Sequence, residues 1–272
     1  MIPAPFTYRR AWSVDEALEL AGQGGDDAKF LAGGHSLLPL MKLRFAVPEV
    51  LIDIGRLREL SFIRDEDASI AVGALTSHHD LATSGLLARE LPLLAHAAGC
   101  VGDPQVRHRG TIGGSLAHGD PAGDLPAVIL ALDATLIALG PAGRREVGGA
   151  EFFRGLFETA LAPGELLTEI RIPKPRDPAW SFQKFTKRAI DWAIVGVAVQ
   201  GGNVALVNMG PAPLRAVAVE QALAGGAAPA DAAAHAAEGT SPVDDVNADR
   251  GYRQHLARVL VARALAESRS RT

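Results

Sequence analysis

The glycine pair Gly33-Gly34 constrains the fold more than any other feature, because it separates two apolar runs of different character. Residues 30–32 form a short run that is typical of a strand, whereas residues 36–43 carry apolar side chains at helical spacing. A strand, a glycine turn and a helix in this order indicate an α/β unit.

The residues on either side of this turn extend the same unit. Ser13 and Glu16 have the spacing of a capping box, which predicts a helix that ends at Gly22. Residues 50–54 predict a further strand. We therefore expect a first subdomain at about residues 1–56.

A second region, residues 57–175, alternates short strands and helices. It includes a predicted helix near residues 91–98 and predicted strands at 135–139 and 166–172, the last of which ends at Pro173. The following segment KPRDP, residues 174–178, is rich in proline and charge and is the clearest linker in the sequence. We place the main domain boundary there.

Residues 176–272 predict a C-terminal α+β domain. Four consecutive strands are expected at residues 181–187, 193–200, 204–209 and 214–219, and Gly201-Gly202-Asn203 predicts a hairpin turn. Two alanine-rich helices are expected near residues 229–238 and 252–267. Strands followed by helices are typical of an α+β arrangement.

Composition excludes several classes of partner. The formal net charge of −4 and the pI near 6.1 give no electrostatic reason to expect binding to nucleic acid. No apolar stretch has the length of a signal peptide core or a membrane span, so we expect a cytoplasmic protein. The single cysteine, Cys100, excludes an internal disulfide and the usual set of thiolate ligands for an iron–sulfur cluster.

The first glycine loop has the chemistry of an anion site. Paired glycines before a helix let backbone N–H groups approach a phosphate, and the helix dipole favours its negative charge. An ordinary tight turn is the alternative. The spacing of a Rossmann fingerprint and the Gly-Lys-Ser/Thr of a Walker loop are both missing.

A second glycine pair, Gly113-Gly114, lies in the segment 109–128. Asp124, near the end of this segment, is of a type that accepts hydrogen bonds from sugar or ribityl hydroxyls. The alternative is that Asp124 caps the N-terminus of a helix at residues 125–132. The presence of two glycine loops favours a dinucleotide site.

The histidines match no zinc-binding pattern, so no metal site is predicted, and these side chains are interpreted as surface or capping residues. No nucleophile or acid–base motif stands out either, and no catalytic residue is assigned. The histidines concerned are His78, His79, His96, His108 and His118.

Four segments, in order and across nearly the whole chain, carry a family resemblance. They are AGGHSLLPLMKLR, RGTIGGSLAHGDPAGDLPA, GELLTEIRIP and NMGPAPLRA. Together they resemble the medium, FAD-binding subunit of the molybdenum hydroxylase superfamily, which includes xanthine dehydrogenase and carbon monoxide dehydrogenase. The Gly-Gly-His-Ser form of the first loop is most similar to the carbon monoxide dehydrogenase branch, whereas Ser115 stands where the family commonly has asparagine.

The resemblance implies an α+β fold: a two-subdomain, PCMH-type FAD-binding region at residues 1–175, followed by the C-terminal domain at residues 176–272. It implies non-covalent FAD, with the pyrophosphate at the two loops, Asp124 on ribityl hydroxyls, and Leu167, Lys184 and Trp192 near the ring. Strand alternation places Leu167 on one face of its strand and Ile170 and Ile172 on the other. The implied FAD-binding residues are Ala32, Gly33, Gly34, His35, Ser36, Leu37, Thr111, Ile112, Gly113, Gly114, Ser115, Asp124, Leu167, Lys184 and Trp192.

The resemblance also implies a division of labour between subunits. A large partner subunit would hold the molybdenum cofactor, a small partner would hold [2Fe–2S] clusters, and this chain would pass electrons from those clusters to an external acceptor. A dimer of heterotrimers is the implied assembly. Two other functions stay open: a flavin oxidase that works alone, and an assembly subunit without redox function.

Overall fold

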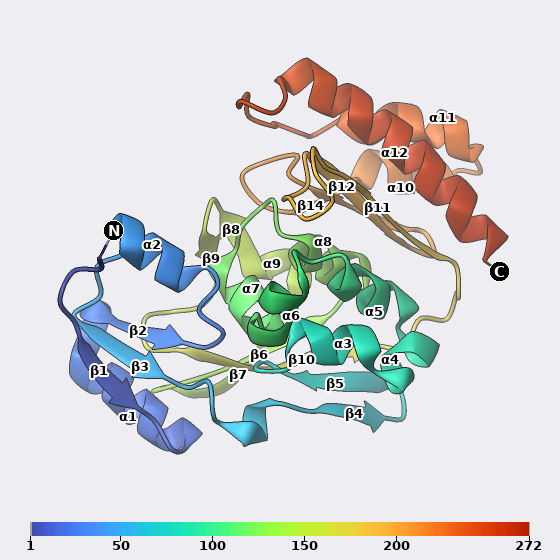
Figure 1. Ribbon diagram of the computed structural model, residues 1–272. Coiled ribbons are helices and arrows are strands. Elements are labelled where there is room, and N and C mark those ends of the chain that lie inside the picture. Colours follow the sequence, from blue (N-terminus) through green and yellow to red (C-terminus); the bar gives the residue numbers. More distant parts are fainter. Residues whose placement is uncertain (1, 272) are drawn as a thin grey trace.

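The computed structural model describes residues 2–271 and arranges them around three larger sheets and one two-stranded sheet (Figure 1). The first sheet is parallel, with strand order β1-β3-β2. Ser13 accepts a hydrogen bond from the amide of Glu16 at 3.1 Å, so the predicted capping box is present. The elements of this unit are β1 (Thr7–Arg10), α1 (Val14–Gly24), β2 (Ala28–Leu31), α2 (Leu37–Leu43) and β3 (Val50–Asp53).

The second sheet is antiparallel, with strand order β4-β5-β10-β6-β7. Its strands are β4 (Ile63–Glu66), β5 (Ser69–Gly73), β6 (Thr135–Gly140), β7 (Gly143–Gly148) and β10 (Leu166–Pro173), and β8 (Phe153–Gly155) and β9 (Glu158–Thr159) form a separate hairpin. The helices of this region are α3 (His78–Thr83), α4 (Gly85–Glu90), α5 (Pro92–Gly99), α6 (Pro104–Arg109), α7 (Ile112–His118), α8 (Asp124–Ala131) and α9 (Gly149–Phe152).

The third sheet is antiparallel, with strand order β11-β12-β13-β14, and the predicted hairpin turn at Gly201-Gly202 joins β12 to β13. One predicted strand is largely wrong: residues 214–219 form only a two-residue strand, after which α10 begins at Val217. The elements are β11 (Trp180–Phe185), β12 (Val195–Gln200), β13 (Asn203–Val207), β14 (Leu214–Arg215), α10 (Val217–Ala224), α11 (Pro229–Ala233), a 3-10 turn (Ala234–Ala237) and α12 (Arg250–Ser270).

Helices α5 and α8 lie between the second and third sheets, and α12 covers the outer face of the third sheet (Figure 1). The core between the sheets is continuous: Val128 and Ile129 of α8 share one apolar cluster with Ala198 of β12 and Ala205 of β13. The C-terminal sheet is therefore packed directly on the helices of the preceding region. The α+β fold expected from the sequence is confirmed.

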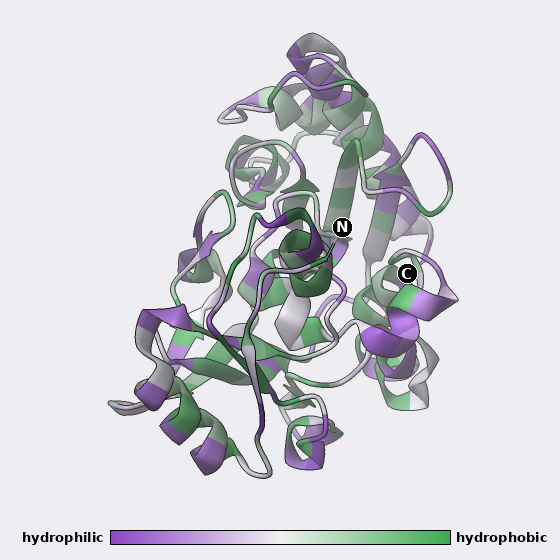
Figure 2. Cartoon of the chain, turned by 60° about the vertical axis from the view of Figure 1, so that its left-hand side comes forward, coloured by the Kyte–Doolittle hydropathy of each residue, from purple (hydrophilic) through white to green (hydrophobic). Residues whose placement is uncertain are grey.

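Hydrophobic and hydrophilic residues alternate along most of the helices, as the hydropathy colouring in Figure 2 shows. This pattern is that of helices with one buried face. Within residues 2–271, no helix is both long enough and apolar enough to cross a bilayer.

Candidate functional site

The first glycine loop lies at the carboxyl end of the parallel sheet, directly after β2 (Figure 1). Gly34 has a φ of 81°, a left-handed conformation that glycine adopts without steric cost. Five consecutive backbone amides, those of Gly33, Gly34, His35, Ser36 and Leu37, donate to no other described residue. This row of free donors can bind a negatively charged oxygen cluster such as a pyrophosphate.

The second glycine pair is folded differently from the loop that the sequence predicted. Residues from Ile112 onward form α7, and the first amides of this helix are already bonded within the protein. The amide of Ile112 donates to the Thr76 carbonyl at 3.0 Å, that of Gly113 to the Ala74 carbonyl at 2.8 Å, and that of Gly114 to the Thr111 hydroxyl at 3.1 Å. This segment therefore offers fewer free donors than the first loop.

Close backbone packing explains the glycines of both loops. A β-carbon built on Gly33 would lie 2.0 Å from the carbonyl oxygen of Arg109, and one on Gly113 would lie 2.6 Å from the carbonyl oxygen of Ala74. A β-carbon on Gly114 would lie 4.0 Å from that of Ala32. The two glycine segments thus touch each other and form one continuous surface.

His78 supports this surface from behind. Its amide donates to the Gly110 carbonyl at 3.0 Å, and its ring packs against Gly110. Burial, together with the nearby His35 and Arg107, lowers the pKa of His78 to about 4. The expectation of a surface or capping histidine is wrong for His78, which is only 4% exposed. Residues 2–271 contain no cluster of three or more histidine, cysteine, aspartate or glutamate side chains that could hold a metal ion.

Asp124 and Lys184 form a buried ion pair. Lys184 Nζ lies 2.7 Å from Asp124 Oδ2 and also donates to the Cys100 carbonyl at 3.1 Å. Burial raises the pKa of Asp124 to about 6, although the charge and hydrogen bond of Lys184 act in the opposite direction. Asp124 Oδ1 is buried and has no hydrogen-bond partner among the described residues. The N-cap interpretation of Asp124 is wrong, because Gly123 occupies that position and the Asp124 side chain binds Lys184.

Leu167 is buried in β10, opposite Ala138 of β6. A bulge between Leu167 and Glu169 shifts the strand register at this point. Leu167 consequently joins the same apolar cluster as Ile170 and Ile172. The expectation from strict alternation, that Leu167 points to the other face of the strand from these two residues, is therefore wrong.

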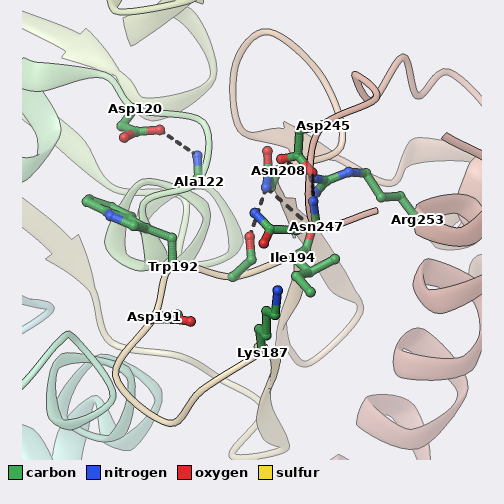
Figure 3. A pocket seen from close by; sticks show the side chains of 11 residues that line it. Asp120, Ala122, Lys187, Asp191, Trp192, Ile194, Asn208, Asp245, Asn247 and Arg253 are labelled. Atoms are coloured by element: carbon green, nitrogen blue, oxygen red, sulfur yellow. Dashed lines mark hydrogen bonds and ion pairs between the residues drawn. The ribbon is translucent and has the colours of Figure 1, made fainter. Parts of the chain in front are cut away.

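Trp192 lies in the loop between β11 and β12 and is 60% exposed. It lines a pocket of about 360 Å³ between the C-terminal domain and the segment that follows α7 (Figure 3). Asp120 and Ala122 contribute from that segment. The other lining residues are Lys187, Asp191, Ala193, Ile194, Asn208, Asp245, Asn247 and Arg253.

A second pocket, of about 390 Å³, is lined mainly by the segment that follows β3. A β-carbon on Gly55 would lie 3.3 Å from the Ala32 carbonyl oxygen, which places this pocket next to the start of the free amides. Its lining residues are Gly55, Arg56, Leu57, Arg58, Ser61 and Leu75. One lining residue, Gly55, therefore lies beside the start of the first loop.

The structure brings the sequence-predicted residues together in three groups. The first loop touches the second glycine segment, Asp124 pairs with Lys184, and Trp192 lines the pocket in Figure 3. Sequence reasoning missed His78, Asp120, Asn208 and Arg253. Asp120 and Asn208 gave a signal, because each lies in a segment that carries the family resemblance.

Two family models cover the chain. An FAD-binding domain of molybdopterin dehydrogenases matches residues 4–175, and a carbon monoxide dehydrogenase flavoprotein C-terminal domain matches residues 180–268. The carbon monoxide dehydrogenase medium chain of Hydrogenophaga pseudoflava is 44% identical over 279 residues, which cover 97% of each chain. A subunit alpha of the 6-hydroxypseudooxynicotine dehydrogenase complex of Paenarthrobacter nicotinovorans is 40% identical, over 98% of this chain and 96% of that one.

A solved structure agrees with these sequence matches. The structure of carbon monoxide dehydrogenase from Hydrogenophaga pseudoflava that lacks the Mo-pyranopterin moiety of its cofactor contains a chain similar to this one. It superposes with a TM-score of 0.96 at 45% identity, over 100% of this chain and 99% of that chain.

Proposed function

Because the chain belongs to the family of FAD-binding medium subunits of molybdenum hydroxylases, we propose that it is the electron-transfer flavoprotein of such a complex. In this role it carries electrons from the [2Fe–2S] clusters of a partner subunit to an external acceptor. The observation that carries the proposal is the row of five free amides on the first loop, which meets the second glycine segment.

The fit to FAD rests on charge and space. A pyrophosphate is negatively charged, and the amides of Gly33 to Leu37 are donors without a partner in the protein. The backbones of the two glycine segments approach so closely that a side chain on Gly33 is excluded. We propose non-covalent contact with FAD at Ala32, Gly33, Gly34, His35, Ser36, Leu37, Thr111, Ile112, Gly113, Gly114, Ser115, Asp124, Leu167, Lys184 and Trp192.

The Asp124–Lys184 pair gives this set a defined polar group. Above a pH of about 6, Asp124 is ionised, Oδ2 is held by Lys184, and Oδ1 remains free to accept a hydrogen bond from a ribityl hydroxyl. Lys184 stabilises the ionised form and holds the carboxylate in one orientation. The pair therefore acts in the binding and orientation of FAD.

FAD supplies the chemistry, since a flavin exchanges electrons singly or in pairs. The chain's own residues bind and orient it, and Leu167 contributes a buried apolar wall. Cys100 is the one cysteine, so the clusters need ligands from another chain. In the proposed complex a small partner subunit holds the clusters and a large one holds the molybdenum cofactor. A dimer of heterotrimers, a location in the cytoplasm, and domain limits at residues 1–56, 57–175 and 176–272 are parts of the same proposal.

The substrate is a property of the partner that holds molybdenum. The two relatives described above belong, by their names, to enzymes that act on carbon monoxide and on 6-hydroxypseudooxynicotine, two unlike compounds. Both are chains of multi-subunit enzymes by name, which favours the subunit role over an oxidase that works alone. A redox titration separates the electron-transfer role from that of an assembly subunit, because bound flavin in an assembly subunit would accept no electrons from reduced clusters.

The test is to purify the chain with and without its co-expressed partner subunits, record its absorption spectrum before and after adding FAD, and identify the flavin released by acid. We expect one FAD per chain. The variant Asp124→Ala should bind FAD more weakly, because it removes the hydroxyl acceptor. A colourless protein that takes up no FAD, even with its partners, would refute the proposal.

A further inference from the structure

The loop that carries Trp192 is exposed at this residue and buried where it leads into β12. Its indole is 60% exposed and has no ring or hydrogen-bonding partner among residues 2–271. The peptide groups that follow are buried, and Ala193 and Ile194 are 2% and 8% exposed. The position of the indole is therefore set by the residues that hold these two peptide groups.

Two side chains hold them. Asn208 Nδ2 donates to the Ala193 carbonyl at 2.8 Å and to the Ile194 carbonyl at 3.4 Å. Arg253 Nη1, from α12, donates to the same Ile194 carbonyl at 2.5 Å. Figure 3 shows Trp192 directed away from this group, toward Asp120 and Ala122.

Asn208 also reaches the opposite wall of the pocket. Its backbone amide donates to the Pro121 carbonyl at 2.8 Å, three residues before Asp124. To make both contacts, Asn208 adopts a φ of 61°, in the left-handed region that asparagine tolerates better than most residues. One residue thus ties the Trp192 loop to the segment that leads into Asp124.

Arg253 is anchored in turn. It is 1% exposed, and its Nη2 lies 2.6 Å from Asp245 Oδ2. Asp245 Oδ1 accepts hydrogen bonds from the amides of Asn247 and Ala248 at 2.8 and 3.0 Å. The guanidinium therefore has a fixed orientation and transmits the position of α12 to the Ile194 carbonyl.

We infer that Asn208 and Arg253 are positioning residues, which hold the Trp192 indole against the flavin ring. The inference rests on the proposed function, and it gives the C-terminal domain a specific task at the cofactor. The pyrophosphate contacts lie on other elements, so loss of either residue should change the environment of the flavin more than its affinity.

The experiment uses the full chain loaded with FAD, together with its partner subunits where the wild type requires them for loading. The readout is the fluorescence yield of the bound flavin, because an indole next to the ring quenches it. The key variant is Asn208→Gly, which keeps the left-handed backbone and the bond to Pro121 but removes the side-chain donor. Arg253→Met is the second variant, and Gln221→Ala, at an exposed position of α10, is the control.

We expect Trp192→Ala to raise the flavin fluorescence, and Asn208→Gly and Arg253→Met to produce most of the same rise, whereas Gln221→Ala produces none. In the Trp192→Ala background, Asn208→Gly should add nothing. The Kd for FAD of Asn208→Gly should stay within about twofold of wild type, because its donor and the pyrophosphate loop share no partner.

Three results would overturn the inference: an unchanged yield in Trp192→Ala, an unchanged yield in Asn208→Gly, or a further rise in the double variant. Each of these requires FAD to be bound. A wild-type protein that takes up no FAD would refute the proposed function itself, so the two failures are distinguishable. Thermal unfolding of each variant identifies any change that arises from a fold lost altogether.

Discussion

Replacing Gly33 by alanine should separate the two glycine segments. The added β-carbon would lie 2.0 Å from the Arg109 carbonyl oxygen and 3.0 Å from the Gly110 Cα, whereas ordinary contact begins at 3.4 Å. These atoms belong to backbones, so no side-chain rotation relieves the overlap. The segments must move apart by about 1.4 Å, the difference between the shortest and the ordinary distance.

The expected loss of affinity follows from the free amides. Because the overlap lies at Gly33, the start of the loop is displaced relative to the rest of it, and about two of the five donors move beyond hydrogen-bonding range of a phosphate oxygen held by the others. Each charge-assisted bond contributes about 1.5–3 kcal/mol, so the total loss is about 3–6 kcal/mol. The Kd for FAD should rise by about a hundredfold to about ten-thousandfold.

The assay is a titration of the apoprotein with FAD, followed by flavin fluorescence. The matched control is Gly22→Ala, because Gly22 lies in α1 and a β-carbon there meets no atom within 4 Å. Thermal unfolding shows whether each variant is folded. A folded Gly33→Ala protein with the affinity of the control would refute the assignment of this loop to the pyrophosphate.

Three further predictions concern stability. The pKa of Asp124 rises from 3.8 to about 6 on folding, so the folded state binds the extra proton, and the free energy of unfolding should fall by up to about 3 kcal/mol as the pH rises through that window. Urea titrations at a series of pH values should show this fall in the free energy of unfolding in wild type and not in Asp124→Asn. The same pH dependence in both proteins would contradict the prediction. For His78, the pKa falls from 6.5 to about 4, so stability present above pH 6.5 should be lost on acidification, by up to about 3 kcal/mol. His78→Gln should lack this loss of stability on acidification, and a variant with the same pH dependence of stability as wild type would argue against the prediction. Ser13→Ala removes the oxygen that accepts from the Glu16 amide and should cost about 1 kcal/mol in chemical denaturation, whereas no change would mean that the cap is without effect.

Local features of this fold could be predicted from the sequence, because their causes are local. The Ser13 cap bonds an amide three residues away, and the Gly201-Gly202 turn joins adjacent strands. The end of β10 at Pro173 follows from the missing amide hydrogen of proline. In the first loop, the glycine pair and the following helix also lie within a few residues of each other.

The second glycine segment could not be predicted in the same way. Its residues are small and turn-like, yet they form α7, because distant carbonyls bind the first amides of the helix. The amides of Ile112 and Gly113 donate to the carbonyls of Thr76 and Ala74, which lie more than 30 residues earlier. The bulge beside Leu167 is likewise a result of strand pairing, since it arises where β10 adjusts to β6.

The buried pair at the site depends on still longer contacts. Lys184 and Asp124 are 60 residues apart, and only the packing of the third sheet on α8 brings them together. The sequence identified both residues through the family resemblance, but not their ion pair. In the same way, the strand predicted at residues 214–219 gives way to α10, where Glu220 accepts a hydrogen bond from the amide of Val204.

Helix α8 is the element that joins the site to the C-terminal domain. Lys184 binds Asp124 at its first turn, and at its last turn Asn203 Nδ2 donates to the Ala131 carbonyl at 2.9 Å. A chain cut at the linker after Pro173 would lose both ties and leave Asp124 without its cation. Since Lys184 holds the Asp124 carboxylate in one orientation, we expect the FAD-binding region to need the C-terminal domain to form this polar pair. The linker predicted at residues 174–178 therefore joins two segments of the chain whose side chains form one buried ion pair.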